Sequence, residues 1–241
     1  MSSEADLEED KPHSTGIFVP DEATETYSSE HVFVPPHYDG YVDSVMLTNG
    51  AIQDRICKLA RDVRSAYPGV TIHLVCVLKG GAAFFHDLQR HLRVYHDYLS
   101  PAAASGSYIP FTLDFVRCKS YEGTSSSGSV EVTGMSDFQN LRGRHVLLVE
   151  DMIDTGRTMS KVVPHLRQYV GETGSVRVCA LFQKRTPLSC GFEADFTGFT
   201  IPNRFVVGYC LDYNEAYRDL NHVCVINDAG IEKFRDWIHR E

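Results

Sequence analysis

No apolar run in the 241-residue sequence approaches the length of about 20 residues that a membrane-spanning helix requires. The first ten residues also lack the basic and apolar character of a signal or transit peptide. They contain five acidic residues instead, Glu4, Asp6, Glu8, Glu9 and Asp10. The last three residues, HRE, match no simple C-terminal targeting signal. We therefore expect a cytoplasmic protein that has no membrane partner.

Positive charge is scarce as well. The sequence has 23 Lys and Arg against 32 Asp and Glu, which gives a formal net charge of −9. Proteins that bind duplex nucleic acid need clustered positive charge, so the composition argues against a nucleic-acid partner. A pocket for a small anion stays open, because such a pocket depends on a few side chains and on backbone dipoles.

The seven cysteines are an odd number and include no CxxC pair. Most of them lie in apolar or β-rich runs, where cysteine behaves as a small hydrophobic residue. The pattern therefore argues against a disulfide framework and against a zinc site.

The chain divides into a short polar segment and one domain. Residues 1–15 are acidic and rich in serine, and we expect them to form a disordered tail. The remaining 226 residues, 16–241, have the length of one domain, and 43% of the sequence is hydrophobic, which is enough for a sizeable core.

Within the domain, segments with helical spacing alternate with apolar, β-rich segments. In the first of them, for example, Ile52, Ile56, Leu59 and Val63 recur at helical spacing with charged residues between them. The expected helices are 51–66, 82–95 and one ending near Tyr169, and the expected strands are 72–78, 111–118, 145–151, 176–183, 205–209 and 223–226. This order predicts an α/β fold with a mainly parallel sheet, and ligands of such sheets bind at the carboxyl ends of the strands.

The strongest functional signal is HVLLVEDMIDTGRTM, residues 145–159. An apolar strand delivers two adjacent acids, Glu150 and Asp151, to its carboxyl end, and Asp154 follows. A helix then opens with Thr155, Gly156, Arg157 and Thr158. N–H groups at a helix start bind phosphate, and glycine lets a ligand approach the backbone closely. Carboxylates beside a phosphate site suit sugar hydroxyls and a divalent metal.

The motif matches neither GxGxxG nor GxxxxGK[ST], which disfavours a dinucleotide-binding fold and a P-loop nucleoside triphosphatase. It resembles the phosphoribosyl pyrophosphate signature of the type I phosphoribosyltransferases. Other segments narrow the resemblance to the hypoxanthine-guanine phosphoribosyltransferases: VCVLKGGAAFF (75–85), RCKSYEG (117–123), KRTP (184–187) and FVVGYCLDYNEAYRDLNHVCVI (205–226). The similarity runs from about Ile17 to about Phe234.

The resemblance implies the fold of that family, a central mainly parallel sheet with a small hood made of N- and C-terminal segments. It implies purine salvage: hypoxanthine or guanine and phosphoribosyl pyrophosphate (PRPP) would give IMP or GMP and pyrophosphate, with Mg²⁺ as cofactor. The partners would be these small molecules and further copies of the chain, since members of the family form dimers or tetramers.

At the motif, the resemblance implies that Glu150 and Asp151 bind the ribose hydroxyls and take part in the metal site. Asp154 would be the catalytic acid or base at N7 of the purine. The 5′-phosphate would bind to Thr155, Gly156, Arg157 and Thr158.

Two further segments would complete the PRPP site. Lys79 and Gly80 would contact pyrophosphate, at a position where the family has a cis peptide bond. Ser120 and Tyr121 would begin a lid over the reacting centre, formed by residues 120–129. By local sequence alone, the first segment is an ordinary strand-to-helix turn and the second a flexible hairpin connection.

The base end of the site would use residues from the last third of the chain. Lys184 would donate to the 6-oxo group, Phe205 would stack on the base and the Val206 backbone would read its edge. Asp212 would contribute to the purine pocket and to the metal site. Arg218 would bind pyrophosphate through two parallel hydrogen bonds.

Two other functions remain open on the sequence. A regulator that binds PRPP or a nucleotide without turnover could keep the phosphate motif, although Asp154, Lys184 and the lid sequence argue against it. The second is a transferase of the same family for another base, xanthine or a pyrimidine. One backbone contact near Val206 can decide between guanine and hypoxanthine, and the sequence does not show its orientation.

Overall fold

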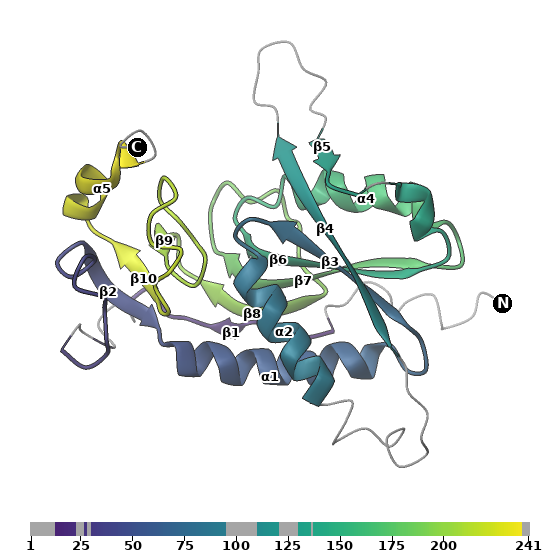
Figure 1. The fold of residues 1–241 in the computed structure, drawn as a ribbon, viewed down its shortest axis with the longest axis horizontal. Coiled ribbons are helices and arrows are strands. Elements are labelled where there is room, and N and C mark those ends of the chain that lie inside the picture. Colours follow the sequence, from purple (N-terminus) through teal and green to yellow (C-terminus); the bar gives the residue numbers. More distant parts are fainter. Residues whose placement is uncertain are drawn as a thin grey trace, which may run out of the picture.

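The structure, a computed structural model, describes residues 13–22, 27, 30–94, 110–120, 130–135 and 137–237. Two sheets organise this part of the chain (Figure 1). None of the helices in these residues is long and apolar enough to cross a membrane.

The larger sheet has seven strands in the order β1-β8-β7-β6-β3-β4-β5 (Figure 1). Its strands are β1 (Ile17–Phe18), β3 (Ile72–Leu78), β4 (Phe111–Ser120), β5 (Val130–Thr133), β6 (His145–Ile153), β7 (Ser175–Lys184) and β8 (Phe196–Ile201). Neighbouring strands are parallel except β4 and β5, which are antiparallel. The predicted mainly parallel sheet is therefore confirmed.

Helices cover both faces of this sheet. They are α1 (Asn49–Ala66), α2 (Ala82–Val94), α4 (Met159–Val170) and a short 3-10 helix, Phe138–Leu141. Leu74 and Cys76 of β3 belong to the apolar cluster that contains α1 and α2, whereas Val75 and Val77 belong to the cluster that contains α4. Because side chains alternate along a strand, a strand covered on both sides is apolar throughout.

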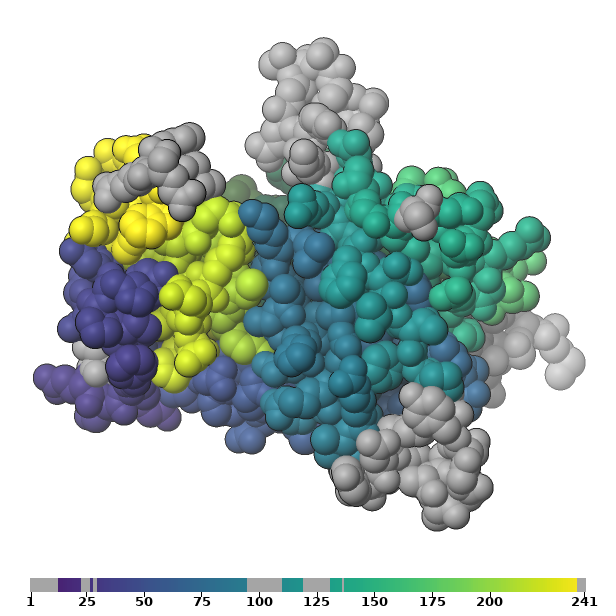
Figure 2. All heavy atoms as spheres, viewed as in Figure 1, coloured from purple at the N-terminus to yellow at the C-terminus, as the bar shows by residue number. Residues whose placement is uncertain are grey.

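The smaller sheet joins distant parts of the sequence and forms a hood beside the larger one (Figure 1). Its strands, in spatial order, are β2 (Val42–Leu47), β10 (Val223–Ile226) and β9 (Val206–Val207). Helix α5 (Asp228–Phe234) follows β10 in the chain. The rings of Tyr38 and Tyr217 stack with centroids 4.4 Å apart, and the Tyr217 N–H donates to the Tyr38 hydroxyl at 2.9 Å. These contacts tie the N-terminal part of the hood, purple in Figure 2, to its C-terminal part, yellow and yellow-green in the same view.

The structure corrects the predicted boundary of the acidic tail. Ser14 forms a parallel bridge with Phe196, and its hydroxyl donates to the Asp62 carboxylate at 2.9 Å. Residues 13–15 therefore belong to the ordered domain, because they extend the line of β1 along β8. Residues 1–12 lie outside the described residues.

Two strand ends also differ from expectation. The strand predicted at 205–209 contains only Val206–Val207, because Gly208 has a φ of 92° and Tyr209 a φ of 51°, and the chain turns there. The strand predicted to end at Asp151 continues to Ile153. The two adjacent acids, predicted as the last two residues of the strand, are therefore followed by two further strand residues.

Candidate active site

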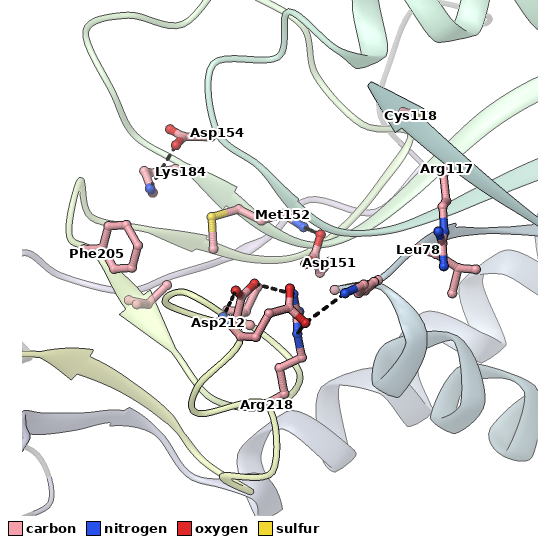
Figure 3. Close-up of a pocket in the computed structure, with 15 residues that line it drawn as sticks. Leu78, Arg117, Cys118, Asp151, Met152, Asp154, Lys184, Phe205, Asp212 and Arg218 are labelled. Atoms are coloured by element: carbon pink, nitrogen blue, oxygen red, sulfur yellow. Dashed lines mark hydrogen bonds and ion pairs between the residues drawn. The ribbon is translucent and has the colours of Figure 1, made fainter. Parts of the chain in front are cut away.

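A pocket of about 550 Å³ opens at the carboxyl ends of β3, β6 and β7, beside the hood (Figure 3). It gathers nine of the residues expected in a site: Lys79, Gly80, Asp151, Asp154, Lys184, Phe205, Val206, Asp212 and Arg218. Glu150 and the turn from Thr155 to Thr158 are not among the residues that line it.

The turn after β3 fits tightly against β6. The peptide bond between Leu78 and Lys79 is cis, as the resemblance implied. A Cβ atom added to Gly80 would lie only 1.6 Å from Oδ2 of Asp151. Glycine is therefore required at this position if the Asp151 carboxylate is to face the pocket.

The two adjacent acids of β6 lie in an environment that disfavours their charge. Burial, and secondarily the neighbouring Asp151, raises the pKa of Glu150 well above its ordinary value. Burial also raises the pKa of Asp151, although the Met152 N–H donates to its Oδ1 at 2.8 Å and opposes the shift. The Oε2 atom of Glu150 is buried without a hydrogen-bond partner. A cation or a hydroxyl donor would compensate these carboxylates.

At one end of the pocket, the Lys184 ammonium lies 3.1 Å from Oδ2 of Asp154 (Figure 3). The Lys184 side chain is only 9% exposed, while that of Asp154 is 55% exposed. A buried ammonium with one exposed carboxylate as partner has donors left for a ligand.

The wall beside this pair is formed by the hood. Phe205 is 53% exposed, and its ring meets that of Tyr213 edge-on, with centroids 5.7 Å apart. Val206 faces Val225 in an antiparallel pair, and the Ile226 N–H donates to the Phe205 carbonyl at 3.2 Å. Hydrogen-bonded and non-hydrogen-bonded pairs alternate in such ladders, so the N–H and C=O of Val206 point away from β10, at the edge of the sheet.

At the other end, two cations and two carboxylates form a network. Arg218 contacts Oδ1 of Asp212 at 2.7 Å and Oε1 of Glu215 at 2.7 Å. Lys79 contacts Oε2 of the same Glu215 at 2.9 Å. The pKa of Glu215 falls to about 2, because Arg218 first and then Lys79 bond its carboxylate.

The loop that carries this network holds unusual backbone. Five residues other than glycine have φ between 49° and 74°: Tyr209, Cys210, Asn214, Glu215 and Tyr217. Each such residue costs of order 1–3 kcal/mol and persists only where its surroundings hold it. One such contact is the Tyr209 hydroxyl, which donates to Asp87 of α2 at 2.5 Å.

The turn after β6 has the features of an anion site beside the pocket. Helix α4 begins after Thr158 without a side-chain cap. The Ser160 and Lys161 N–H groups already donate to the Gly156 and Thr158 carbonyls, so an anion would be bound by N–H groups of the turn that precedes them. Gly156 has a φ of 79°, and a Cβ there would lie 2.8 Å from Cβ of Phe192. The Cys190 N–H holds the turn by donating to the Thr155 carbonyl at 2.8 Å.

Comparison with known proteins decides the family. The phosphoribosyl transferase domain model matches residues 45–214. The hypoxanthine-guanine-xanthine phosphoribosyltransferase of Plasmodium falciparum is 43% identical over 91% of this chain and 91% of its own length. The human hypoxanthine-guanine phosphoribosyltransferase is 43% identical over 92% of this chain and 98% of its own. The chain belongs to the phosphoribosyltransferase family.

A solved phosphoribosyltransferase has the same fold. The crystal structure of the hypoxanthine-guanine phosphoribosyltransferase of Schistosoma mansoni in complex with IMP has a TM-score of 0.71 and 35% identity, covering 91% of this chain and 99% of that one. The type I phosphoribosyltransferase fold predicted for the chain is confirmed, and the chain is a pentosyl-transferring enzyme.

Several predicted residues of this transferase are not brought together. The described residues contain no group of three or more His, Cys, Asp and Glu side chains placed to hold a metal ion. Glu150, Asp151 and Asp212, predicted as metal ligands, therefore form no protein-only metal cage. Ser120 ends β4 but its side chain is not described, and Tyr121 lies outside the described residues.

Sequence reasoning missed one acidic residue that lines the pocket, Glu215. Glu215 contacts Arg218, three residues later, within a turn rather than a helix, so no periodic pattern in the sequence marked this pair. Its contact with Lys79 joins residues 136 positions apart, which no local pattern indicates.

Proposed function

We propose that this phosphoribosyltransferase joins hypoxanthine or guanine to PRPP, releasing IMP or GMP and pyrophosphate. The observation that carries the proposal is the pairing of Lys184 with Asp154 at 3.1 Å, in the same pocket as the outward-facing backbone of Val206. The relatives named above have this activity in their names, one of them with xanthine as a further base.

The base end is suited to a 6-oxopurine. The buried Lys184 ammonium is a donor for the 6-oxo group, and Phe205 offers an exposed ring for stacking. Asp154 accepts from Lys184 while no base is bound and handles the proton at N7 when one is. Adenine has an amino group in place of the 6-oxo group and would turn a donor toward the Lys184 donor.

The sugar and its 5′-phosphate fit the segment that follows β6. Asp151 lines the pocket and accepts hydrogen bonds from ribose hydroxyls, and Glu150 lies behind it as a second buried carboxylate. Positive charge develops on the sugar as its bond to pyrophosphate breaks, and nearby carboxylates favour that charge. The uncapped start of α4 and the turn from Thr155 to Thr158 receive the 5′-phosphate.

The donor set fits Mg²⁺ bound together with the substrate. Mg²⁺ in proteins commonly uses one or two carboxylates and completes its shell with water and phosphate oxygens. Asp151 and Asp212 line the pocket, and the buried Oε2 of Glu150, next to Asp151 in the chain, has no hydrogen-bond partner. When bound, Mg²⁺ would supply charge neutralisation for the diphosphate.

Three further parts of the proposal concern closure, assembly and location. Ser120 and Tyr121 begin a lid that excludes water from the reacting centre. The enzyme works as a homodimer or homotetramer, in the cytoplasm.

The test is a spectrophotometric turnover assay of the purified protein with PRPP and Mg²⁺. Hypoxanthine, guanine, xanthine, adenine and uracil are supplied separately. Turnover of hypoxanthine and guanine that stops on chelation of Mg²⁺ is the expected result. PRPP binding without turnover of any base would overturn the proposal in favour of a regulator.

A further inference from the structure

At the end of the pocket formed by Lys79 and Arg218, which we call the diphosphate end, both cations already contact a carboxylate of the protein, that of Glu215. The carboxylate of Glu215 contacts Lys79 through Oε2 and Arg218 through both oxygens, at distances of 2.7–3.2 Å. Arg218 donates to it through two nitrogens, Nε and one terminal NH2 group. This fork is the geometry with which arginine binds phosphate.

The balance of charges that line the pocket makes this contact important for the binding of a polyanion. Four basic and four acidic side chains line it: Lys79, Arg117, Lys184, Arg218, Asp151, Asp154, Asp212 and Glu215. The lining therefore has no formal net positive charge with which to attract a polyanion. Three of the four cations, Lys79, Lys184 and Arg218, contact carboxylates of the same lining. A diphosphate gains these three as partners only where a carboxylate gives them up.

Glu215 is well placed to give up its partners. Its contact with Lys79 is half-exposed, with side-chain exposures of 55% for Lys79 and 34% for Glu215, and ion pairs of this kind contribute little. Its backbone has a φ of 68°, in the left-handed region that glutamate rarely adopts. Glu215 N–H donates to Oδ2 of Asp212 at 2.8 Å, so the backbone stays anchored while the side chain moves.

We propose that Glu215 sets the affinity of this end of the site by acting as an internal substitute for a diphosphate. Its carboxylate holds Lys79 and Arg218 while the site is empty, and it leaves them when the diphosphate of PRPP or free pyrophosphate binds. The same carboxylate competes for both cations when pyrophosphate leaves, and so promotes product release. This inference rests on the proposed function for the identity of the diphosphate.

The alternative is that Glu215 only positions Arg218 for the ligand. The two roles predict opposite effects of removing its charge. Loss of a competitor strengthens diphosphate binding, whereas loss of a positioning group weakens it or leaves it unchanged.

The experiment measures the dissociation constant of inorganic pyrophosphate with excess Mg²⁺ by calorimetry, for the full chain and for Glu215→Gln. We expect the dissociation constant to fall about fivefold, the factor that corresponds to an exposed or partly exposed ion pair. Glu232→Gln is the matched control, because Glu232 pairs with Arg235 at the same three-residue spacing on α5. The control should leave the dissociation constant unchanged.

A second variant and a second ligand protect the interpretation. Glu215→Asn removes the charge with a residue that tolerates left-handed backbone, and it should shift pyrophosphate binding in the same direction. IMP, which has no diphosphate, should bind both variants within about twofold of the unchanged protein, a factor below about 0.5 kcal/mol.

Pyrophosphate binding that is unchanged or weaker in both variants overturns the proposal, and so does undetectable binding in all proteins. Tighter binding in both variants, with the control unchanged, supports it. The turnover assay on the unchanged protein separately tests the proposed function. A protein that turns over hypoxanthine but shows no gain in Glu215→Gln refutes this inference alone.

Discussion

The Tyr209 hydroxyl donates to the Asp87 carboxylate at 2.5 Å and thereby joins the strained loop of the pocket to helix α2. Gln53 of α1 donates to the same carboxylate oxygen at 2.6 Å. The main chain of Tyr209 is held as well, since its N–H donates to the Leu220 carbonyl at 2.6 Å. Two core helices thus hold the start of the loop that carries Asp212, Glu215 and Arg218.

Tyr209→Phe should loosen this loop without emptying the core. Losing one hydrogen bond to a carboxylate should lower the free energy of unfolding by about 1.5 kcal/mol. The KM for PRPP should rise severalfold, while the KM for hypoxanthine changes less, because the loop bears the diphosphate end. Denaturant unfolding and steady-state kinetics measure both effects. Tyr41→Phe, whose ring packs on Phe234 in the hood, serves as control, and equal effects in the two variants would refute the role of Tyr209.

Asp154→Asn should lower turnover by about 100-fold to 10,000-fold, the range for loss of a general acid or base. PRPP binding should remain close to that of the unchanged protein. Single-turnover kinetics and PRPP titration separate the two quantities. Asp39→Asn, at an exposed position in the hood, is the control. Unchanged turnover in Asp154→Asn would remove Asp154 as acid or base.

Lys184→Ala should weaken the binding of hypoxanthine and guanine about 10-fold to 100-fold, as expected for one hydrogen bond from a charged donor. Discrimination against adenine should decrease in the same variant. Competition assays with each base in turn measure the profile. An unaltered profile would mean that Lys184 does not read the 6-oxo group.

Glu150→Gln should stabilise the protein at neutral pH and not at acidic pH. The pKa of Glu150 is raised in the folded protein, so the folded state binds more protons than the unfolded state above the ordinary value of 4.5. Glu150 therefore reduces stability progressively as pH rises from that value, and glutamine removes this dependence. Denaturant unfolding between pH 4 and pH 8, with a chelator present, measures the difference. A gain that is largest at pH 4 would contradict the assignment.

Gly80→Ala should reduce activity strongly, because the added Cβ would lie 1.6 Å from Oδ2 of Asp151. Either the turn or the carboxylate has to move, and overpacking of this kind costs about 1–3 kcal/mol of stability. Gly50→Ala is the control. Gly50 lies in the first turn of α1, and a Cβ added there would have no neighbour closer than 3.9 Å. The substitution should therefore stabilise the protein by about 0.5–1 kcal/mol. Calorimetric unfolding and turnover compare the two, and full activity in Gly80→Ala would refute the requirement for glycine.

The sequence predicted well the strands that are buried along their whole length. Ile72–Leu78 in the central sheet and Val223–Ile226 in the hood have the bounds that their apolar runs indicate. The strand Phe196–Ile201 was not predicted, although it is buried, since Gly198 and two threonines interrupt its apolar pattern. The two-residue strands Ile17–Phe18 and Val206–Val207 are too short for any periodicity.

The site residues likewise divide into those that a local motif identifies and those that only the fold brings together. The motif around Asp154 is local, so its residues could be named from the sequence. The left-handed backbone of Tyr209 has no local signal, because aromatic residues rarely adopt it and only contacts such as the one with Asp87 maintain it. The ion pair between Lys79 and Glu215 forms only because the fold brings these two distant segments together.

The hood has a consequence for the order in which a new chain acquires its parts. Val45 pairs with Cys224, so β2 leaves the ribosome long before the strand that completes its sheet. Every strand of the larger sheet has been made by Ile201, whereas Val45, 1% exposed in the finished molecule, has no sheet to enter until β10 exists. The proposed base site is thus completed only after Val223–Ile226 has been made, and a chain that stops before Val223 would have its catalytic motif without the central strand of the hood.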